Sequence, residues 1–409
     1  MEKYYQRTTC RICGSVDLRE FLNLGKTPLA NSLLKAEDLN KSEDIFPLSV
    51  SYCVNCSLVH VPHVVNPEIL FSDYYFITSA SSPSIDHFKK YSRDILNNFI
   101  ASITDLVVDI GGNDGTLLNE LKNDCKVLNI EPATNIADIS RKKGIPTLNN
   151  FFTKDLVKTI TADYGPAKVV TANNVIAHTD TVKELFEGVK ELLAPDGVFI
   201  FEAHWVKNLI GEGGFDQVYH EHLCYYSLHA LKYLVESVGL SIFDVTTVPI
   251  QGESLRVYVA KNRPAKPAVA EFLAKEEKLG LNTFETFENF SEKVIANKNQ
   301  TVALLTKLKT EGKKIVGYGA PAKGSTLLNF YGIGKETLDY ITDTTSLKQG
   351  LYMPGVHIQI LPPDELLKSK PDYILLLAWN YAEAILEKEK DLRASGVKFI
   401  IPVPTVTIV

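Results

Sequence analysis

The sequence has no excess of basic residues, and this narrows the kind of partner to expect. Its 409 residues include 43 lysines and arginines against 49 aspartates and glutamates, a net charge of −6. Proteins that bind nucleic acids or anionic membranes electrostatically present clusters of positive charge. We therefore expect no nucleic-acid partner and favour a small molecule.

Long hydrophobic runs are also missing. The densest apolar run, residues 374–379, is far shorter than the roughly 20 residues that span a bilayer. The opening residues, MEKYYQR, contain no apolar segment of the kind that signal peptides carry. We expect no membrane association, a cytoplasmic location, and a monomer or a weak homo-oligomer.

Cysteine is scarce, with six in the chain, too few for a disulfide framework in a protein of this length. Four of them form two CxxC pairs: Cys10, Cys13, Cys53 and Cys56. Each pair can present two thiolates to a tetrahedral zinc ion. We expect a structural zinc, because four protein ligands leave no open position for catalysis; four free thiols are the alternative. The two isolated cysteines are expected to be unreactive.

The length exceeds what one hydrophobic core supports, so more than one domain is expected. Short apolar runs alternate with helix-length segments from residue 106, and again from residue 314, which is the pattern of βα units and mostly parallel sheets. We predict an α/β protein. Its expected parts are residues 1–65, an N-terminal zinc-binding module; 66–99, a helical and aromatic connector to the substrate site; 100–262, a central Rossmann-like domain; and 263–409, a helical connector with a C-terminal Rossmann-like domain.

The apolar runs give the expected strands. In the central domain these are residues 106–110, 127–130, 169–171 and 198–201, followed by an antiparallel pair at 240–245 and 255–259. In the C-terminal domain they are residues 314–318, 338–342, 373–377 and 398–401. Helices are expected at 85–100 and 117–121.

A glycine-rich turn follows the first central strand, where glycines let the backbone approach a ligand closely. Its candidate ligand residues are Asp109, Gly111, Asn113, Asp114 and Gly115. The turn departs from the dinucleotide pattern G-x-G-x-x-G, because Asn113 fills the middle glycine position. The next strand ends at Glu131, where a carboxylate can accept both ribose hydroxyls of a nucleoside. This combination favours S-adenosylmethionine as the cofactor.

Two more groups lie near the same expected sheet edge. Phe151 and Phe152 are candidates for packing against adenine, with ordinary core packing as the alternative. Asn173 and Asn174 follow the fourth strand, at the edge where ligands of α/β sheets bind.

An insertion separates the fifth strand from the helix expected at residue 228. It contains the run YHEHLCYYS at residues 219–227, the densest group of ionisable side chains in the chain. A methyltransferase sheet receives its acceptor at this place. Metal ligation by His220 and His222, or ordinary packing of both, are the alternatives.

The C-terminal domain opens with a G-x-G-x-x-A pattern from Gly317 to Ala322, and Asp343 follows 21 residues later. Taken alone, this pattern indicates NAD. Pro321 and Lys323 instead suit the loop to a phosphorylated group, with a solvated Lys323 as the alternative.

Together these motifs resemble, over almost the whole chain, the sugar C-methyltransferases that act on nucleotide-linked 4-keto deoxysugars, including enzymes of tylosin and tetronitrose biosynthesis. The motifs that carry the resemblance are the two CxxC pairs, PLAN at 28–31, DIGGNDGT at 109–116, YHEHLCYYS at 219–227, GYGAPAKG at 317–324 and LAWNY at 377–381.

The resemblance implies a class I methyltransferase domain and a C-terminal domain that helps to hold a nucleotide-diphosphate sugar. It implies methylation at C3 through an enolate, and it identifies candidate residues. The catalytic candidates are His222, Glu221, Tyr219, His178 and Tyr75. The substrate-binding candidates are Tyr74, Lys323, Gly319, Trp379 and Asn380.

A carbon nucleophile next to a ketone requires a base and a group that stabilises the oxyanion. His222 is the candidate base for the C3 proton, since imidazole titrates near neutral pH, and Glu221 is expected to orient or polarise it. His178 and Tyr219 are expected to donate hydrogen bonds to the enolate oxygen at C4.

The sequence departs from the family pattern at two places, which suggests an unusual acceptor. His204-Trp205 stands where a proline-containing Glu-x-Pro segment is expected, and residues 251–256 replace a more glycine-rich turn. Three alternatives stay open: a methyltransferase for a different ketone, an NAD-dependent oxidoreductase, and a noncatalytic zinc adaptor.

Overall fold

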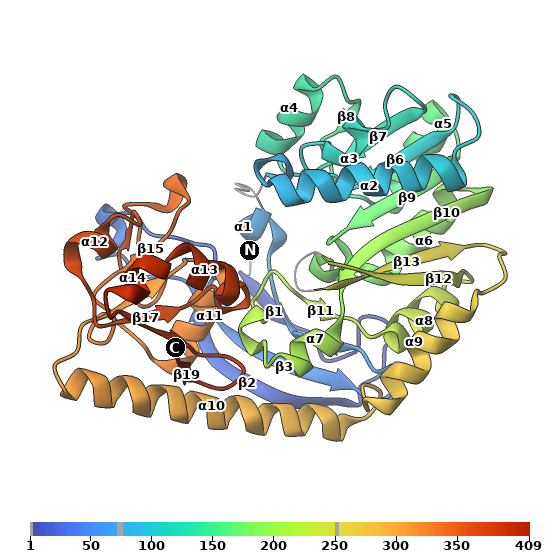
Figure 1. The fold of residues 1–409 in the computed structure, drawn as a ribbon. Helices are drawn as coiled ribbons and strands as arrows, with labels where there is room; N and C mark the ends of the chain where they lie inside the picture. The colour runs from blue at the N-terminus through green and yellow to red at the C-terminus, as the bar shows by residue number, and fades with distance from the viewer. Residues whose placement is uncertain (1–2, 72–76, 250–252) are drawn as a thin grey trace.

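The computed structural model describes residues 3–71, 77–249 and 253–409. An N-terminal cysteine-rich module, a central α/β domain and a C-terminal α/β domain follow one another along the chain (Figure 1). Tyr74 and Tyr75, the tyrosines expected at the substrate, lie outside the described residues.

The central domain is built on a seven-stranded sheet of order β12-β13-β10-β9-β6-β7-β8. Its strands are β6 (Leu106–Ile110), β7 (Lys126–Ile130), β8 (Thr147–Leu148), β9 (Ala167–Asn173), β10 (Leu193–His204), β12 (Ser241–Val248) and β13 (Ser254–Ala260). The strands from β10 to β8 pair in parallel. β12 and β13 pair antiparallel, as expected for the last two apolar runs.

Helices cover both faces of this sheet, and successive strand residues alternate between the two layers. They are α2 (Ser82–Phe99), α3 (Thr116–Asn119), α4 (Thr134–Lys142), α5 (Lys154–Tyr164), α6 (Val182–Leu192) and α8 (Leu228–Ser237), with the 3-10 helix η3 (Ile176–His178). Val107 packs with Tyr91 of α2 in one core. Val108 packs with Phe186 of α6 in the other. Burial on both faces explains why the strands read as continuous apolar runs.

The N-terminal module contains a four-stranded sheet of order β11-β4-β3-β2 and a small β1-β5 pair. Its elements are β1 (Tyr4–Gln6), β2 (Leu18–Pro28), η1 (Ala36–Asp38), β3 (Ile45–Cys53), β4 (Val59–His60), β5 (His63–Val65), α1 (Pro67–Phe71) and η2 (Thr78–Ala80). The fourth strand, β11 (Cys224–Tyr225), comes from the insertion of the central domain and pairs antiparallel with β4. The insertion also contains α7 (Val206–Gly211) and η4 (Phe215–Gln217). The insertion is therefore joined to the N-terminal module by backbone hydrogen bonds.

The C-terminal domain has a six-stranded sheet of order β16-β15-β14-β17-β18-β19, parallel except for the last pair. Its elements are β14 (Ile315–Tyr318), α11 (Ala322–Tyr331), β15 (Ile341–Thr342), η5 (Ser346–Lys348), β16 (Ile360–Leu361), α12 (Glu365–Ser369), β17 (Tyr373–Leu376), η6 (Trp379–Tyr381), α13 (Ala382–Lys388), α14 (Lys390–Ala394), β18 (Lys398–Ile401) and β19 (Thr407–Ile408). β15 is shorter than the predicted strand 338–342, because the amide of Leu338 bonds to the Gly334 carbonyl in a turn.

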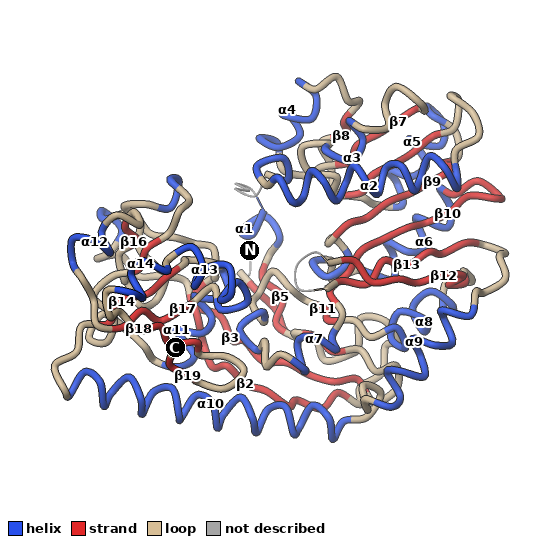
Figure 2. The backbone as a smooth tube through the Cα atoms, in the orientation of Figure 1, coloured by secondary structure: helices blue, strands red, loops and turns tan. Residues whose placement is uncertain are grey.

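Two helices connect the central and C-terminal domains, α9 (Pro267–Lys278) and the 27-residue α10 (Phe284–Thr310). α10 runs beneath the N-terminal sheet toward the C-terminal domain (Figure 2). Phe287 of α10 lies 5.2 Å from Phe21 of β2, measured between ring centroids. The N-terminal sheet, α10 and the C-terminal sheet share one hydrophobic core. Within the described parts of the chain, no helix combines the length and apolarity needed to cross a bilayer.

Candidate active site

The glycine-rich turn between β6 and α3 needs glycine for both conformation and packing. Gly111 and Gly115 have φ values of 62° and 74°, a region that side chains rarely adopt. A Cβ on Gly111 would lie 2.6 Å from Val175 Cγ2, and one on Gly115 would lie 2.4 Å from Ile145 Cδ1. These two glycines are therefore required to close the turn against the protein.

Two predicted cofactor ligands, Asp109 and Asp114, form hydrogen bonds that stabilise this turn. Asp109 is buried and accepts a 2.6 Å hydrogen bond from Thr171, and burial raises its pKa to about 7. Both oxygens of Asp114 have protein donors: Thr116 Oγ1 at 2.6 Å on one, and Ser79 N and Lys143 Nζ on the other. Asp114 therefore stabilises the turn through its own neighbours, and a contact of Asp114 with the cofactor stays a prediction.

Glu131, Asn173 and Asn174 are polar residues at the carboxyl ends of β7 and β9. Glu131 accepts the amides of Asn113 at 3.0 Å and Ala133 at 2.9 Å, and burial raises its pKa. Among the described residues, the buried amide atoms of Asn173 and the Oδ1 of Asn174 have no hydrogen-bond partner. Buried polar atoms are normally satisfied, so these groups fit a hydroxyl- and amine-bearing nucleoside ligand.

Phe152 is a partly buried ring that packs against the core. A Cβ on Gly188 of α6 would lie 3.0 Å from the Phe152 ring, which packs with Val157 of α5. This contact agrees with the core alternative, and the adenine contact of Phe152 stays a prediction. Phe151 is 47% exposed.

His222 is fixed at both ring nitrogens. Its Nδ1 lies 3.2 Å from the carbonyl oxygen of Gln217, and its Nε2 lies 2.9 Å from the Tyr219 hydroxyl. A carbonyl can only accept, so Nδ1 carries the proton and Nε2 presents its lone pair to Tyr219. The site thus holds a neutral imidazole in a defined tautomer.

Two more histidine rings surround His222. His178 of η3 and His204 at the end of β10 have ring centroids 4.9 and 5.3 Å from that of His222. Burial, followed by the repulsion of His178 and His204, lowers the pKa of His222 well below its ordinary value. Burial likewise lowers the pKa of His178 to about 4. His178 and His222 are therefore neutral at physiological pH.

Glu221 is bonded to the N-terminal module. Its Oε1 accepts a 2.7 Å hydrogen bond from the Asn31 amide. Burial raises the pKa of Glu221, and the Asn31 bond opposes this rise. The His222 ring is held by the Gln217 carbonyl, and a role of Glu221 in orienting or polarising His222 stays a prediction. Asn31, in the motif at 28–31, had no predicted role.

His220 also contacts the N-terminal module. Its Nε2 bonds to the carbonyl of Pro47 at 3.1 Å, and its ring packs edge-on against Phe46. The alternative of an ordinary packed histidine thus applies to His220. The four N-terminal cysteines are the one group suited to a metal among the residues that the structure describes.

The predicted substrate residues of the C-terminal domain come together at the insertion. Lys323 Nζ lies 4.1 Å above the Trp379 ring and 2.5 Å from Asn380 Oδ1. The Trp379 indole donates to buried Asp216 of η4 at 2.6 Å. Burial lowers the pKa of Lys323. These contacts place a partly desolvated cation beside the insertion.

The NAD-like pattern serves the protein's own packing. A Cβ on Gly319 would lie 2.9 Å from the Ala378 Cβ, so the loops pack closely at this glycine, and its contact with substrate stays a prediction. The two Asp343 oxygens accept the amides of Ala320 and Thr345, each at 2.7 Å. Both Asp343 oxygens are thus bonded by backbone amides, an arrangement that Glu131 also has.

The four cysteines form a compact group in the N-terminal module. Their sulfurs lie within 4.8 Å of one another, with the pairs Cys10–Cys56 and Cys13–Cys53 both at 3.5 Å. A tetrahedral zinc with Zn–S bonds of about 2.3 Å separates its sulfurs by about 3.8 Å. The donor set fits zinc.

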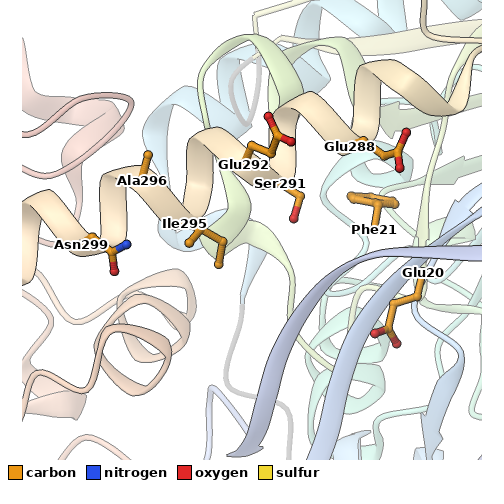
Figure 3. A pocket seen from close by; sticks show the side chains of 8 residues that line it. All are labelled: Glu20, Phe21, Glu288, Ser291, Glu292, Ile295, Ala296 and Asn299. Atoms are coloured by element: carbon orange, nitrogen blue, oxygen red, sulfur yellow. The ribbon is translucent and has the colours of Figure 1, made fainter.

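A groove of about 540 Å³ lies elsewhere, between β2 and α10 (Figure 3). Its lining includes Glu20, Glu288 and Glu292. None of the predicted site residues that the structure describes lines this groove.

Family models match three consecutive parts of the chain. Residues 10–71 match a zinc binding domain, residues 87–245 a methyltransferase domain, and residues 249–404 a C-methyltransferase C-terminal domain. The C-methyltransferase NovU of Streptomyces niveus is 36% identical over 399 residues, covering 97% of this chain and 95% of NovU. The chain belongs to this C-methyltransferase family. It is an S-adenosylmethionine-dependent C-methyltransferase with a zinc-binding N-terminal module.

Solved methyltransferase structures match part of this C-methyltransferase at low similarity. An S-adenosylmethionine-dependent methyltransferase from Clostridium acetobutylicum has a TM-score of 0.34 and 14% identity, covering 44% of this chain and 92% of that chain. Magnesium protoporphyrin IX methyltransferase from Synechocystis has a TM-score of 0.33 and 10% identity, covering 48% and 89%. At these scores neither match carries an argument about the site.

Proposed function

We propose that this C-methyltransferase methylates C3 of a nucleotide-linked 4-keto deoxysugar. The observation that carries the proposal is the Tyr219–His222 pair, in which a neutral imidazole presents Nε2 to a phenol at 2.9 Å. Methylation at carbon next to a ketone needs a base for a C–H proton and a donor for the oxygen that becomes negative. This pair contains one of each.

S-adenosylmethionine, when bound at Glu131 and the glycine-rich turn, supplies an electrophilic methyl group. The residues of the chain prepare the carbon that receives it. The Tyr219 hydroxyl first turns from Nε2 to the C4 carbonyl oxygen, which frees the Nε2 lone pair. His222 Nε2 then takes the C3 proton, the electron pair of the broken C–H bond forms a C3=C4 double bond, and the π pair of the carbonyl moves onto the C4 oxygen as an enolate. His178, with its ring 4.9 Å from His222, donates a second hydrogen bond.

Electrostatics favours a neutral base here. Burial and the two neighbouring histidines destabilise protonated His222. The imidazole therefore stays neutral at pH values well below those at which histidine ordinarily takes up a proton. Each donor to a developing oxyanion is worth about 3 kcal/mol in comparable sites.

The nucleotide part of the acceptor is placed at the C-terminal domain. Lys323 is a partly desolvated cation in a protein of net charge −6, and Trp379 and Asn380 fix its position. A diphosphate is the acceptor group that such a cation selects. A ketone without a phosphate group would not need a cation at this position.

Product analysis tests the proposal. The protein is incubated with S-adenosylmethionine carrying a ¹³C methyl group and with 4-keto-6-deoxyhexoses and 2,6-dideoxyhexoses linked to thymidine, uridine, cytidine or guanosine diphosphate. We expect one of them to gain a methyl group on C3, identified by carbon–proton correlation in NMR. Methylation on oxygen, or of phosphate-free ketones alone, would overturn the proposal.

A further inference from the structure

Arg11 lies inside the first zinc knuckle, between Cys10 and Cys13, yet its side chain points into the central domain. The side chain is fully buried. The knuckle itself is closed by backbone hydrogen bonds from Cys10 N to the Ser15 carbonyl and from Gly14 N to the Cys10 carbonyl. Four thiolates on one zinc would fix this loop, and with it the origin of the Arg11 side chain.

The guanidinium joins segments that are far apart in the sequence. Its Nε donates to Asp180 at 3.1 Å, and its Nη1 donates to the Leu223 carbonyl at 2.8 Å. Its Nη2 donates to the Val61 carbonyl at 2.9 Å. His60 Nδ1, 3.0 Å from Nη1, must accept, since a guanidinium only donates. Buried arginine is tolerated only when paired in this way.

Two of the segments bonded by Arg11, those at Asp180 and Leu223, lie next to a proposed catalytic histidine. Asp180 is two residues after His178, and Leu223 directly follows His222. The two segments are also tied to each other, because Leu223 N donates to the Ala177 carbonyl at 2.7 Å. Arg11 therefore bonds to both segments whose separation sets the distance between the two imidazoles.

We propose that Arg11 is a positioning residue through which the zinc knuckle fixes the relative placement of His178 and His222. The inference rests on the proposed function of these histidines and extends it. The zinc module is then part of the catalytic scaffold of the acceptor site, although the metal touches no reactant. An error of about 1 Å in such a placement can cost about 10²-fold in rate.

The test compares Arg11→Met with Arg11→Lys and with Arg19→Met in zinc-loaded protein. Arg19 is a matched control, since it is a half-exposed arginine of the same module. The readouts are zinc content, S-adenosylmethionine affinity, amide hydrogen exchange of peptides covering 176–180 and 219–225, and kcat and KM for the acceptor.

For Arg11→Met we expect retained zinc and cofactor affinity, and faster exchange in both peptides than in the Arg19→Met control. We expect kcat to fall by about 10- to 100-fold, with a smaller change in KM and partial recovery in Arg11→Lys. Wild-type exchange and kcat in Arg11→Met would overturn the inference. So would loss of zinc or of cofactor binding in step with activity, which indicates a merely structural role.

If Arg11→Met does not fold, Asp180→Asn replaces it in the hydrogen-exchange comparison. This substitution removes the charged partner of Arg11 and leaves the knuckle intact. The same two peptides should then exchange faster, and unchanged exchange would overturn the inference. Hydrogen exchange needs no acceptor. Failure of the wild type to methylate a 4-keto sugar would therefore defeat the proposed function without altering this comparison.

Discussion

Asn31 of the N-terminal module donates a 2.7 Å hydrogen bond to Glu221 in the insertion of the central domain, across 190 residues of sequence. The bond fixes one oxygen of a buried carboxyl group and opposes the rise in its pKa that burial causes. It links the motif at residues 28–31 to the proposed acceptor site.

Asn31→Ala should weaken catalysis and leave cofactor binding intact. A hydrogen bond to a charged group contributes about 1.5–3 kcal/mol, so we expect kcat/KM for the acceptor to fall by about 10- to 100-fold. The pKa of Glu221 should rise further, which moves the loss of activity on acidification to higher pH. Steady-state kinetics over pH measures both effects, with exposed Asn23→Ala as the control. An unchanged pH profile would contradict a role for Asn31.

The strands were the part of the fold most accessible to sequence reasoning. Residues 106–110 form a strand with the predicted bounds, because this buried run is apolar apart from Asp109 and is followed by a glycine. The pairing of β11 with β4 was not predictable, since a two-residue strand carries no periodicity and its partner lies far away in the chain.

The candidate site, like the fold, could be predicted from the sequence only in part. The cysteines and the residues around His222 could be found, because their chemistry is local and their spacing distinctive. Close packing at Gly319 and the core contact of Phe152 were not predictable as such, since glycines that permit close packing and aromatics that fill a core look the same in sequence as ligand contacts. The Asn31–Glu221 bond gave no signal beyond the presence of the motif.

Cys53→Ser should abolish the binding of one zinc per chain. Three thiolates and a hydroxyl hold zinc more weakly than four thiolates, and the loss of a structural metal removes folding free energy. Metal analysis and thermal unfolding should show loss of zinc together with a lower Tm. A folded, fully active Cys53→Ser protein without metal would rule out the structural role.

Glu131→Ala should weaken S-adenosylmethionine binding without affecting the acceptor. The carboxylate lies at the strand end where ribose hydroxyls bind, and its backbone partners Asn113 and Ala133 belong to the same edge. Calorimetry with each ligand measures the two affinities separately. Equal cofactor affinity in the variant and the wild type would place the ribose contact elsewhere.

Lys323→Met should raise KM for the nucleotide-linked acceptor more than it lowers kcat. The substitution removes the cation proposed to bind the diphosphate but keeps an unbranched side chain against Trp379, and a loss of ground-state binding appears mainly in KM. Lys348→Met is a control, since that lysine bonds to the Ala320 carbonyl of the same loop. A selective fall in kcat would argue against the diphosphate contact.

The most direct test of the account follows the C3 proton itself. In deuterated water, with S-adenosylhomocysteine in place of the methyl donor, the wild type should exchange the proton next to the ketone of its acceptor. His222→Asn should lose this exchange together with methylation, by about 10²- to 10⁴-fold, whereas His220→Asn, which alters the histidine that faces Pro47, should retain it. A His222→Asn protein that exchanges the proton at the wild-type rate yet fails to methylate would show that His222 only positions the acceptor, and would contradict its assignment as the base.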